Sequence, residues 1–413
     1  MDCKTRRCIE STVLRTARAL TVALALAPAT LAQQTWIVDK LNRPGTHFRD
    51  LPAAAAAAAA GDVLLVRETT VPSQYYTGPS VLDGKALTVR GEGPSVFVTG
   101  LFEVRGLPSG ARFVIDNLNF QDGSAGLFSF LFESNAGSIV VTRATVRATT
   151  PTLAAGRFVD CVQVIFDHCQ VDVADRPWEF VRSRSTVHDS TFVHSSPGSF
   201  TMGWFFPGTL DLTDSELWLA SSTIRGPSAL SSTPPRAYFA SNPLYVCRST
   251  VHVGPGTTLE GGLDGTGLRY PAFYNSCFVS NPLPVVHVDP SAQTIGGLGA
   301  DVTYHHGSLA GLSYTVTPTT LQVDHLYGPA GASLLVLGPL TSTPWSGGGI
   351  GPVFVDVANA WSDLRLALLP GPSTRTFAIP PGLPPGLLLG AQALTLVPPG
   401  TLLTSNVAAI ALP

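Results

Sequence analysis

Aspartate and histidine side chains gather in three short stretches of this 413-residue chain. Asp167-His168 and His188-Asp189 occupy equivalent positions of two similar segments, and Asp214 follows at the same place in a third. An imidazole beside a carboxylate is a common proton-transfer unit, and two carboxylates about 5 Å apart can act as acid and base. If the segments stack in register, these five residues form a candidate catalytic site.

Two further residues extend this candidate site toward a ligand. Arg248 comes next in the series after Asp214, and Trp178 lies between the two Asp/His pairs. Because an aromatic face can pack against a sugar ring, we assign Trp178 as a candidate ligand-binding residue. We assign Arg248 to the same role as the next polar residue of the series. The competing interpretation is that alternating charges stabilise stacked turns and that Trp178 covers an exposed edge of the core.

A six-position pattern positions these side chains: apolar, any, polar, small, any, apolar. It occurs at residues 115–120, 141–146, 166–171, 187–192, 212–217, 246–251 and 274–279. The first and last positions are always apolar, so both should face a core. The small fourth position also suits a crowded interior, so the inward positions are the first, fourth and sixth. Their spacing of three and then two residues breaks the alternation of a flat strand, which predicts a bend at the polar position. Each segment therefore predicts one turn of a β coil, with equivalent positions stacked in columns.

The composition agrees with a turn-rich protein that forms a core, because 45% of the residues are hydrophobic and the chain has 40 Gly and 34 Pro. The net charge is −3, and no run of Lys or Arg occurs. Nucleic acids and anionic membranes require a concentrated basic surface, so neither is predicted as a partner. The sequence shows no zinc-type spacing, and we predict no metal and no cofactor.

The first 32 residues have the features of a signal peptide. Five basic residues precede an apolar run at 19–31: Lys4, Arg6, Arg7, Arg15 and Arg18. Small residues at Thr30 and Ala32 suit cleavage after Ala32. We therefore expect a secreted or cell-surface protein. The alternative, an uncleaved anchor, would have to cross a bilayer core of about 30 Å with a short apolar run.

Four cysteines follow the predicted cleavage site, in a chain bound for an oxidising compartment. Cys169 and Cys277 share a column about 19 Å apart, whereas a disulfide requires Cα atoms within about 7 Å. Both are expected to be free and buried. Cys247 is out of phase with Cys277 in this alignment, and the states of Cys161 and Cys247 stay open.

The two ends of the coil carry their own signals. Asp50 as N-cap, Pro52 in the first turn, the alanine run 53–60 and Gly61 predict a short helix that covers the first turn. From residue 284 the composition shifts to Gly, Pro, Leu and Val. Strand-like segments at 312–316, 321–326, 333–337, 353–357, 364–368, 374–379 and 407–412 favour a β-sandwich over continuation of the coil.

Residues 36–67, an Ala-rich helix that ends in Gly-Asp before a strand, together with the repeats resemble secreted bacterial proteins of the pectate-lyase-like superfamily. Residues 391–413 are similar to small C-terminal β domains of planctomycete-type bacteria. The pattern and the resemblance imply an all-β fold, a right-handed parallel β-helix that forms a single-stranded solenoid with an N-terminal capping helix. The expected domains are a signal peptide at 1–32, the β-helix at 33–283 and a smaller β-sandwich-like domain at 284–413.

This superfamily includes polysaccharide lyases, glycoside hydrolases and adhesins, so the fold alone does not assign a function. The chain has neither the three-Asp cluster with a following His-Gly of the hydrolases nor the basic and calcium-binding set of the lyases. We therefore expect a non-catalytic protein that binds glycans or cell-surface material, or that serves as a surface structural component. The alternatives are a lyase or hydrolase centred on the Asp/His residues, and an adhesin-like spacer.

Overall fold

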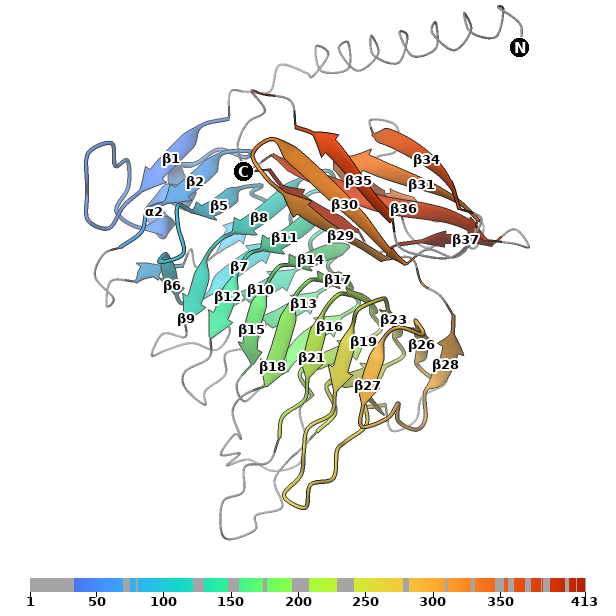
Figure 1. The fold of residues 1–413 in the computed structure, drawn as a ribbon. Helices are drawn as coiled ribbons and strands as arrows, with labels where there is room; N and C mark the ends of the chain where they lie inside the picture. Colours follow the sequence, from blue (N-terminus) through green and yellow to red (C-terminus); the bar gives the residue numbers. More distant parts are fainter. Residues whose placement is uncertain are drawn as a thin grey trace, which may run out of the picture. The chain divides into compact units, whose positions relative to one another are not determined.

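The computed structural model describes residues 33–69, 75–78, 81–121, 130–147, 156–173, 177–194, 208–228, 241–277, 282–307, 309, 311–327, 331–345, 353–355, 360–367, 373–379, 381, 387–397, 401–405 and 407–412 (Figure 1). The expected signal peptide lies outside these residues. Residues 35–413 form one compact unit. In the described part of the chain, no helix has the length and apolar character needed to cross a membrane.

Three parallel sheets form the coil, and each adds one strand per turn. Sheet A contains β1 (Thr35–Val38), β2 (Val63–Val66), β5 (Thr88–Gly91), β8 (Arg112–Asp116), β11 (Ser138–Thr142), β14 (Gln163–Asp167), β17 (Arg184–His188), β20 (Glu216–Ala220), β23 (Thr250–Val253), β26 (Val285–Val288) and β28 (Thr303–His306). Sheet B contains β3 (Tyr76–Thr77), β6 (Phe97–Thr99), β9 (Asn119–Gln121), β12 (Thr145–Arg147), β15 (Gln170–Val173), β18 (Thr191–His194), β21 (Thr223–Arg225), β24 (Thr258–Glu260) and β27 (Gln293–Ile295). Sheet C contains β4 (Leu82–Asp83), β7 (Phe102–Arg105), β10 (Phe130–Glu133), β13 (Gly156–Val159), β16 (Trp178–Val181), β19 (Leu210–Thr213), β22 (Leu244–Cys247) and β25 (Phe273–Asn275). The predicted right-handed parallel β-helix is confirmed.

The predicted bend at the polar position is also confirmed. In six of the seven segments this residue has a left-handed backbone with φ between 43° and 53°: Asn117, Arg143, His168, Asp189, Asp214 and Arg248. One residue in this conformation turns the chain from one sheet into the next and points its side chain outward. The small residue that follows turns inward, where little space remains.

Hydroxyl groups at the small position satisfy backbone donors inside each bend. The N–H of Ser183 donates to Oγ of Ser215 at 3.1 Å, and the N–H of Ser215 donates to Oγ of Ser249 at 3.0 Å. The N–H of Cys169 donates to Oγ of Ser190 in the same way at 2.9 Å. A buried N–H without a partner is costly, so the ladders of small polar residues stabilise the stack of turns.

The seven segments do not form a single column, as the sequence interpretation assumed. The four segments from 115 to 192 form the bend from sheet A to sheet B, whereas 212–217 and 246–251 form the bend from sheet C to sheet A. Val187 therefore pairs with Leu219, and Leu212 pairs with Phe180. Both bends need the same left-handed residue between inward apolar residues, so they share one local pattern.

The ends of the coil differ in part from the predictions. Helix α2 (Leu51–Ala57) has Asp50 as N-cap and Pro52 in its first turn, as predicted, but it ends before the alanine run does. Lys85 Nζ donates to the carbonyl oxygen of Ala55 at 2.7 Å, near the end of the helix. At the other end, parallel pairing continues through β26 and β28, so the coil extends past the predicted boundary at 283.

The C-terminal residues form antiparallel sheets, as predicted. One contains β29 (Gly311–Val316), β30 (Thr320–Tyr327) and β35 (Ser373–Ala378). Another contains β34 (Trp361–Ala367), β31 (Gly331–Gly338), β36 (Leu388–Val397), β37 (Thr401–Thr404) and β38 (Ala408–Ala411), and β32 (Leu340–Trp345) pairs with β33 (Val353–Val355). Apolar side chains of β29, β30, β36 and β38 form a shared core.

This sandwich packs against the outer face of sheet A. Val114, Val140 and Ile165 point away from the coil interior and join an apolar cluster that includes Leu340 and Leu388 of the sandwich. The guanidinium group of Arg112 reaches the carbonyl oxygen of Leu340 at 3.2 Å. Apolar contacts of this kind explain why outward positions of three neighbouring strands carry β-branched residues.

The cysteine predictions were partly wrong. Cys161 and Cys169 are free and buried, as expected for Cys169. Cys277, however, forms a disulfide with Cys247, with Cα atoms 5.1 Å apart. Val246 pairs with Asn275, one residue away from the partner that the repeat alignment implied, and this shift brings the two cysteines together.

Candidate functional site

The Asp167 cluster consists of Asp167, His168, His188 and Asp189 at one bend between sheets A and B. Asp167 and His188 are the last residues of β14 and β17, and they are register partners on adjacent strands. His168 and Asp189 are the left-handed residues that follow them. The structure thus brings together four of the five predicted catalytic residues.

Hydrogen bonds and ion pairs link the cluster around one carboxylate. Asp167 Oδ1 lies 2.5 Å from Nδ1 of His188 and 3.1 Å from Nδ1 of His168. The other ring nitrogen of His168, Nε2, lies 3.0 Å from Oδ2 of Asp189. His168 is therefore held between two carboxylates.

Tyr314 of β29 closes the cluster from the side of the sandwich. Its hydroxyl group forms a hydrogen bond with Oδ2 of Asp167 and lies 3.0 Å from the carbonyl oxygen of Ala409. The Tyr314 ring stacks on His188 with an interplanar angle of 16°. Asp167 and His188 are fully buried beneath it.

The electrostatics of the cluster follow from these contacts. Burial by itself raises the pKa of Asp167, but the neighbouring His168 and His188 outweigh burial and lower that pKa to about 2. The carboxylates of Asp167 and Asp189 raise the pKa of His168 to about 10. Burial and the charge of Asp167 hold the pKa of Tyr314 well above its usual value. The result is a carboxylate and an imidazolium at neutral pH.

Chemically, the cluster resembles a closed ionic network more than an open acid–base centre. Its central carboxylate already contacts two imidazoles and a phenol, and no free face of Asp167 is exposed to solvent. Proton transfer to a substrate requires contact or a single intervening water. The same donors form a potential metal-binding group, because ligand atoms of Asp167, His168 and His188 all lie within 4.8 Å of one another.

The remaining predicted site residues lie elsewhere. Asp214 is at a bend between sheets C and A, where Arg248 binds both of its carboxylate oxygens at 2.7 Å. Arg182 binds Asp160 in the same manner on a preceding turn. These exposed pairs agree with the interpretation of a solvated charge ladder.

Trp178 does not present its ring to a ligand, because only 1% of the residue is exposed. Its ring packs among phenylalanines of the coil core, with centroids 5.3 Å from both Phe166 and Phe192. As the first residue of β16, it points inward together with Phe180. The prediction of a sugar-binding aromatic at this position was wrong.

A second polar group, on the outer face of sheet C, was missed by the sequence interpretation. Glu179, Asp211, Tyr245 and Tyr274 are register partners on four consecutive strands. Burial, followed by the charge of Glu179, raises the pKa of Asp211 to about 6. Outward positions of strands β16, β19, β22 and β25 carry these side chains, so period-two alternation could have identified them once the strands were assigned.

The tyrosines of this group form a partly exposed aromatic surface. The rings of Tyr245 and Tyr274 lie 4.9 Å apart, and Tyr274 is 44% exposed. The hydroxyl group of Ser241 lies 2.8 Å from that of Tyr245 and helps to fix its position. Nearby Tyr270 is 37% exposed.

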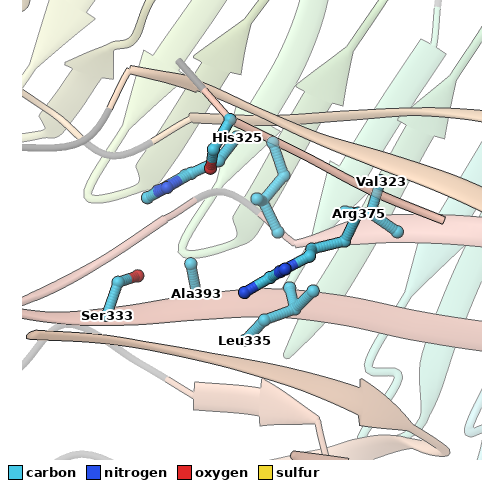
Figure 2. Close-up of a pocket in the computed structure, with 8 residues that line it drawn as sticks. Val323, His325, Ser333, Leu335, Arg375 and Ala393 are labelled. Carbon is cyan, nitrogen blue, oxygen red and sulfur yellow. The ribbon is translucent and has the colours of Figure 1, made fainter. Parts of the chain in front are cut away.

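A small cavity lies between the two sheets of the C-terminal sandwich. Figure 2 shows His325 and Arg375 on one side of this space and Ser333, Leu335 and Ala393 on the other. Its volume of about 30 Å³ suits one or two water molecules and is too small for a sugar. The cavity is therefore a packing feature of the sandwich.

In comparisons with known proteins, no family model and no curated protein matches this chain. The residues of the chain and their geometry are therefore the basis on which a function can be inferred.

Proposed function

We propose that this protein is a secreted or cell-surface β-helix protein of the pectate-lyase-like superfamily that acts without catalysis, as a glycan-binding or structural surface component. The main support is the closure of the Asp167 cluster. Its carboxylate is fully buried and contacts Tyr314, so a polysaccharide has no direct path to it. A buried, fully engaged carboxylate suits stability better than catalysis.

An extracellular location is supported by two independent features. Residues 1–32 have the basic and apolar segments of a signal peptide. The disulfide between Cys247 and Cys277 suits an oxidising compartment, because such bonds are rare in proteins of the reducing cytosol. In this proposal the C-terminal sandwich, with its planctomycete-type tail, serves as the attachment module.

The proposed glycan-binding surface is the outer face of sheet C around Tyr245 and Tyr274. Exposed aromatic rings offer apolar faces to a sugar, and the carboxylates of Glu179 and Asp211 accept hydrogen bonds from hydroxyl groups. Glu179 is paired with Arg157 at 3.4 Å. The acidic residues in this column favour a neutral polysaccharide over an acidic one.

A polysaccharide array that records both retention and the release of new chain ends tests this proposal. We expect retention of a neutral glycan without product, and loss of retention in Tyr274→Ala. The matched control is Trp361→Ala, which removes an aromatic residue with 38% exposure from the sandwich. Product release that disappears in Asp189→Ala would instead identify an enzyme at the Asp167 cluster.

One observation favours a second candidate function, glycoside hydrolysis on sheet C. Asp211 has a raised pKa and lies beside the carboxyl group of Glu179, which pairs with Arg157 at 3.4 Å. Two carboxyl groups in different environments, one with a raised pKa, are the pairing that glycosidases use. Glu179 and Asp211 are register partners on adjacent strands, so both side chains leave the same face of sheet C. Retaining enzymes hold their two carboxyl groups about 5–5.5 Å apart. Release of reducing ends that is abolished in Asp211→Asn, with retention intact, would establish this alternative.

A further inference from the structure

We propose that Asp167, His168 and His188 bind one zinc-class divalent metal ion, which fixes the coil beneath the C-terminal sandwich. This inference does not depend on the proposed glycan-binding function. It concerns a site that the sequence spacing did not predict, because two ligands are adjacent in sequence and the third comes from the next turn of the coil.

The donor set and its spacing carry the proposal. Two imidazole nitrogens and a carboxylate oxygen lie within 4.8 Å of one another. Tetrahedral zinc with bonds of about 2.0–2.2 Å separates its donor atoms by roughly 3.3 Å. The 3.1 Å distance from Asp167 Oδ1 to His168 Nδ1 fits this value, and the 2.5 Å distance to His188 Nδ1 has to lengthen by roughly 0.8 Å. Small side-chain rotations supply that change.

The orientation of His168 supports a metal more specifically. Its Nδ1 atom is buried and has no hydrogen-bond partner among the described residues, although Asp167 Oδ1 is only 3.1 Å away. The ring nitrogen and the carboxylate oxygen are therefore close without being aligned for a hydrogen bond. Binding of a metal releases the Nδ1 proton of His168, because a histidine ligand must be neutral. The freed lone pair and one on Asp167 Oδ1 can then point at a common metal ion.

Two of the three ligands, His168 and Asp167, have the outer-shell contacts of metal sites. His168 Nε2 lies 3.0 Å from Asp189, and a histidine that binds a metal usually donates its other N–H to a carboxylate or carbonyl group. Tyr314 hydrogen-bonds the second oxygen of Asp167, as outer-shell groups do for ligating carboxylates. Imidazole nitrogens favour zinc over calcium or magnesium, which prefer oxygen ligands.

Zinc binding would also explain how the junction is built. The three ligands belong to the coil, whereas Tyr314 belongs to the sandwich, so a metal that orders Asp167 also orders the Tyr314 contact. A ligand that binds only the folded state stabilises it. We therefore expect added Zn²⁺ to raise the unfolding temperature of the whole chain.

The experiment uses the full chain after removal of metal with a chelator. Titration with Zn²⁺ should show one tight equivalent, and Co²⁺ should give the visible absorption of a four-coordinate N/O site. His168→Asn removes a ligand while asparagine tolerates the left-handed backbone, and it should abolish both signals. Asp189→Asn, which changes only the outer shell, should weaken Zn²⁺ binding by about 10- to 100-fold.

A control variant tests the other histidine-rich surface. His252, His287 and His305 stack on sheet A with centroids 4.8 and 5.0 Å apart, and surface imidazoles of this kind can bind zinc adventitiously. His287→Asn should leave the tight equivalent intact. Absence of a tight equivalent, an unchanged Co²⁺ spectrum in His168→Asn, or loss of binding only in His287→Asn would each overturn the proposal. Circular dichroism in chelator would check that each variant is folded.

Discussion

The hydroxyl group of Tyr314 forms a hydrogen bond with the carboxylate of Asp167, a residue that lies 147 positions earlier in the chain. The contact joins the first strand of the sandwich to a bend of the coil. It changes the interpretation of the Asp167 cluster, because its central pair, Asp167 and His188, is buried at this junction, whereas His168 and Asp189 keep part of their side chains exposed.

Tyr314→Phe tests the strength of this junction. The change removes the phenolic donor and leaves the ring packing, so we expect a loss of about 1.5–3 kcal/mol, typical of a hydrogen bond to a charged group. Urea-induced unfolding measures the difference. Tyr274→Phe is the control, because that residue is 44% exposed, and it should change stability by less than about 0.5 kcal/mol. Equal effects of the two changes would contradict this view of the junction.

Ser215→Ala tests the hydroxyl ladder at the bends. Oγ of Ser215 accepts a hydrogen bond from the N–H of Ser183 at 3.1 Å, and both residues are buried. Alanine leaves that N–H without its partner, so we expect destabilisation of about 1–3 kcal/mol in chemical unfolding. Thr303→Ala, at an exposed position of sheet A, should have little effect. A neutral Ser215→Ala would mean that water replaces the hydroxyl group.

Asp211→Asn should stabilise the protein at pH 7. Burial and the charge of Glu179 raise the folded-state pKa of Asp211 to about 6 from an ordinary value of 3.8. The contribution of protonated Asp211 to folding stability is therefore fully present below pH 3.8 and is lost as the pH rises through 6. Melting temperatures should show a gain for the variant at pH 7 and none at pH 4.

The matched control for this change is Asp214→Asn, three residues further along the chain. The ion pair with Arg248 lowers the pKa of Asp214, so the same substitution removes a favourable charge. It should not stabilise the protein at pH 7. A gain for both variants would show that net charge, and not the local environment of Asp211, is responsible.

Stability should fall as the pH drops from about 6.5 to 4, in part because of His287. Burial, with the neighbouring His252 and His305, lowers the pKa of His287 to about 4, against a smaller opposite influence of Glu216. The unfolded state then binds a proton that the folded state does not, so the stabilising contribution is present above pH 6.5 and is lost as the pH falls.

His287→Phe isolates this contribution, because phenylalanine keeps an aromatic ring in the stack and cannot take up a proton. Melting temperatures of the variant and the parent protein should run parallel above pH 7 and converge or cross as the pH falls to 4. Curves that stay parallel over the whole range would show that His287 does not contribute to the acid sensitivity.

Local sequence predicted the bends and the capping helix because each depends on a few neighbouring residues. The left-handed polar residue, the small residue after it and the flanking apolar residues are all contained in six positions, as at Phe166 to Val171. Asp50 and Pro52 likewise act within one helical turn. Patterns of this kind allow the parallel coil to be recognised without knowledge of its contacts.

Tertiary structure decided which bend each segment forms. Residues 187–192 and 212–217 have the same pattern, yet one lies between sheets A and B and the other between sheets C and A. Strand pairing and core packing choose between them, and both are invisible in a local pattern. The shift of one residue that joins Cys247 to Cys277 has the same origin.

The sequence by itself therefore determined the type of coil, its capping helix and the strands of the sandwich, because alternation, bends and caps are short-range properties. Only the tertiary structure placed Tyr314 on Asp167, buried Trp178 in the core and aligned Asp211 with Glu179. Each of these relationships joins residues that are distant in sequence. They meet because successive turns of the coil stack on one another or because the sandwich packs against the coil. The burial and the neighbours of these side chains, and therefore their chemistry, are set only when the sheets have packed together.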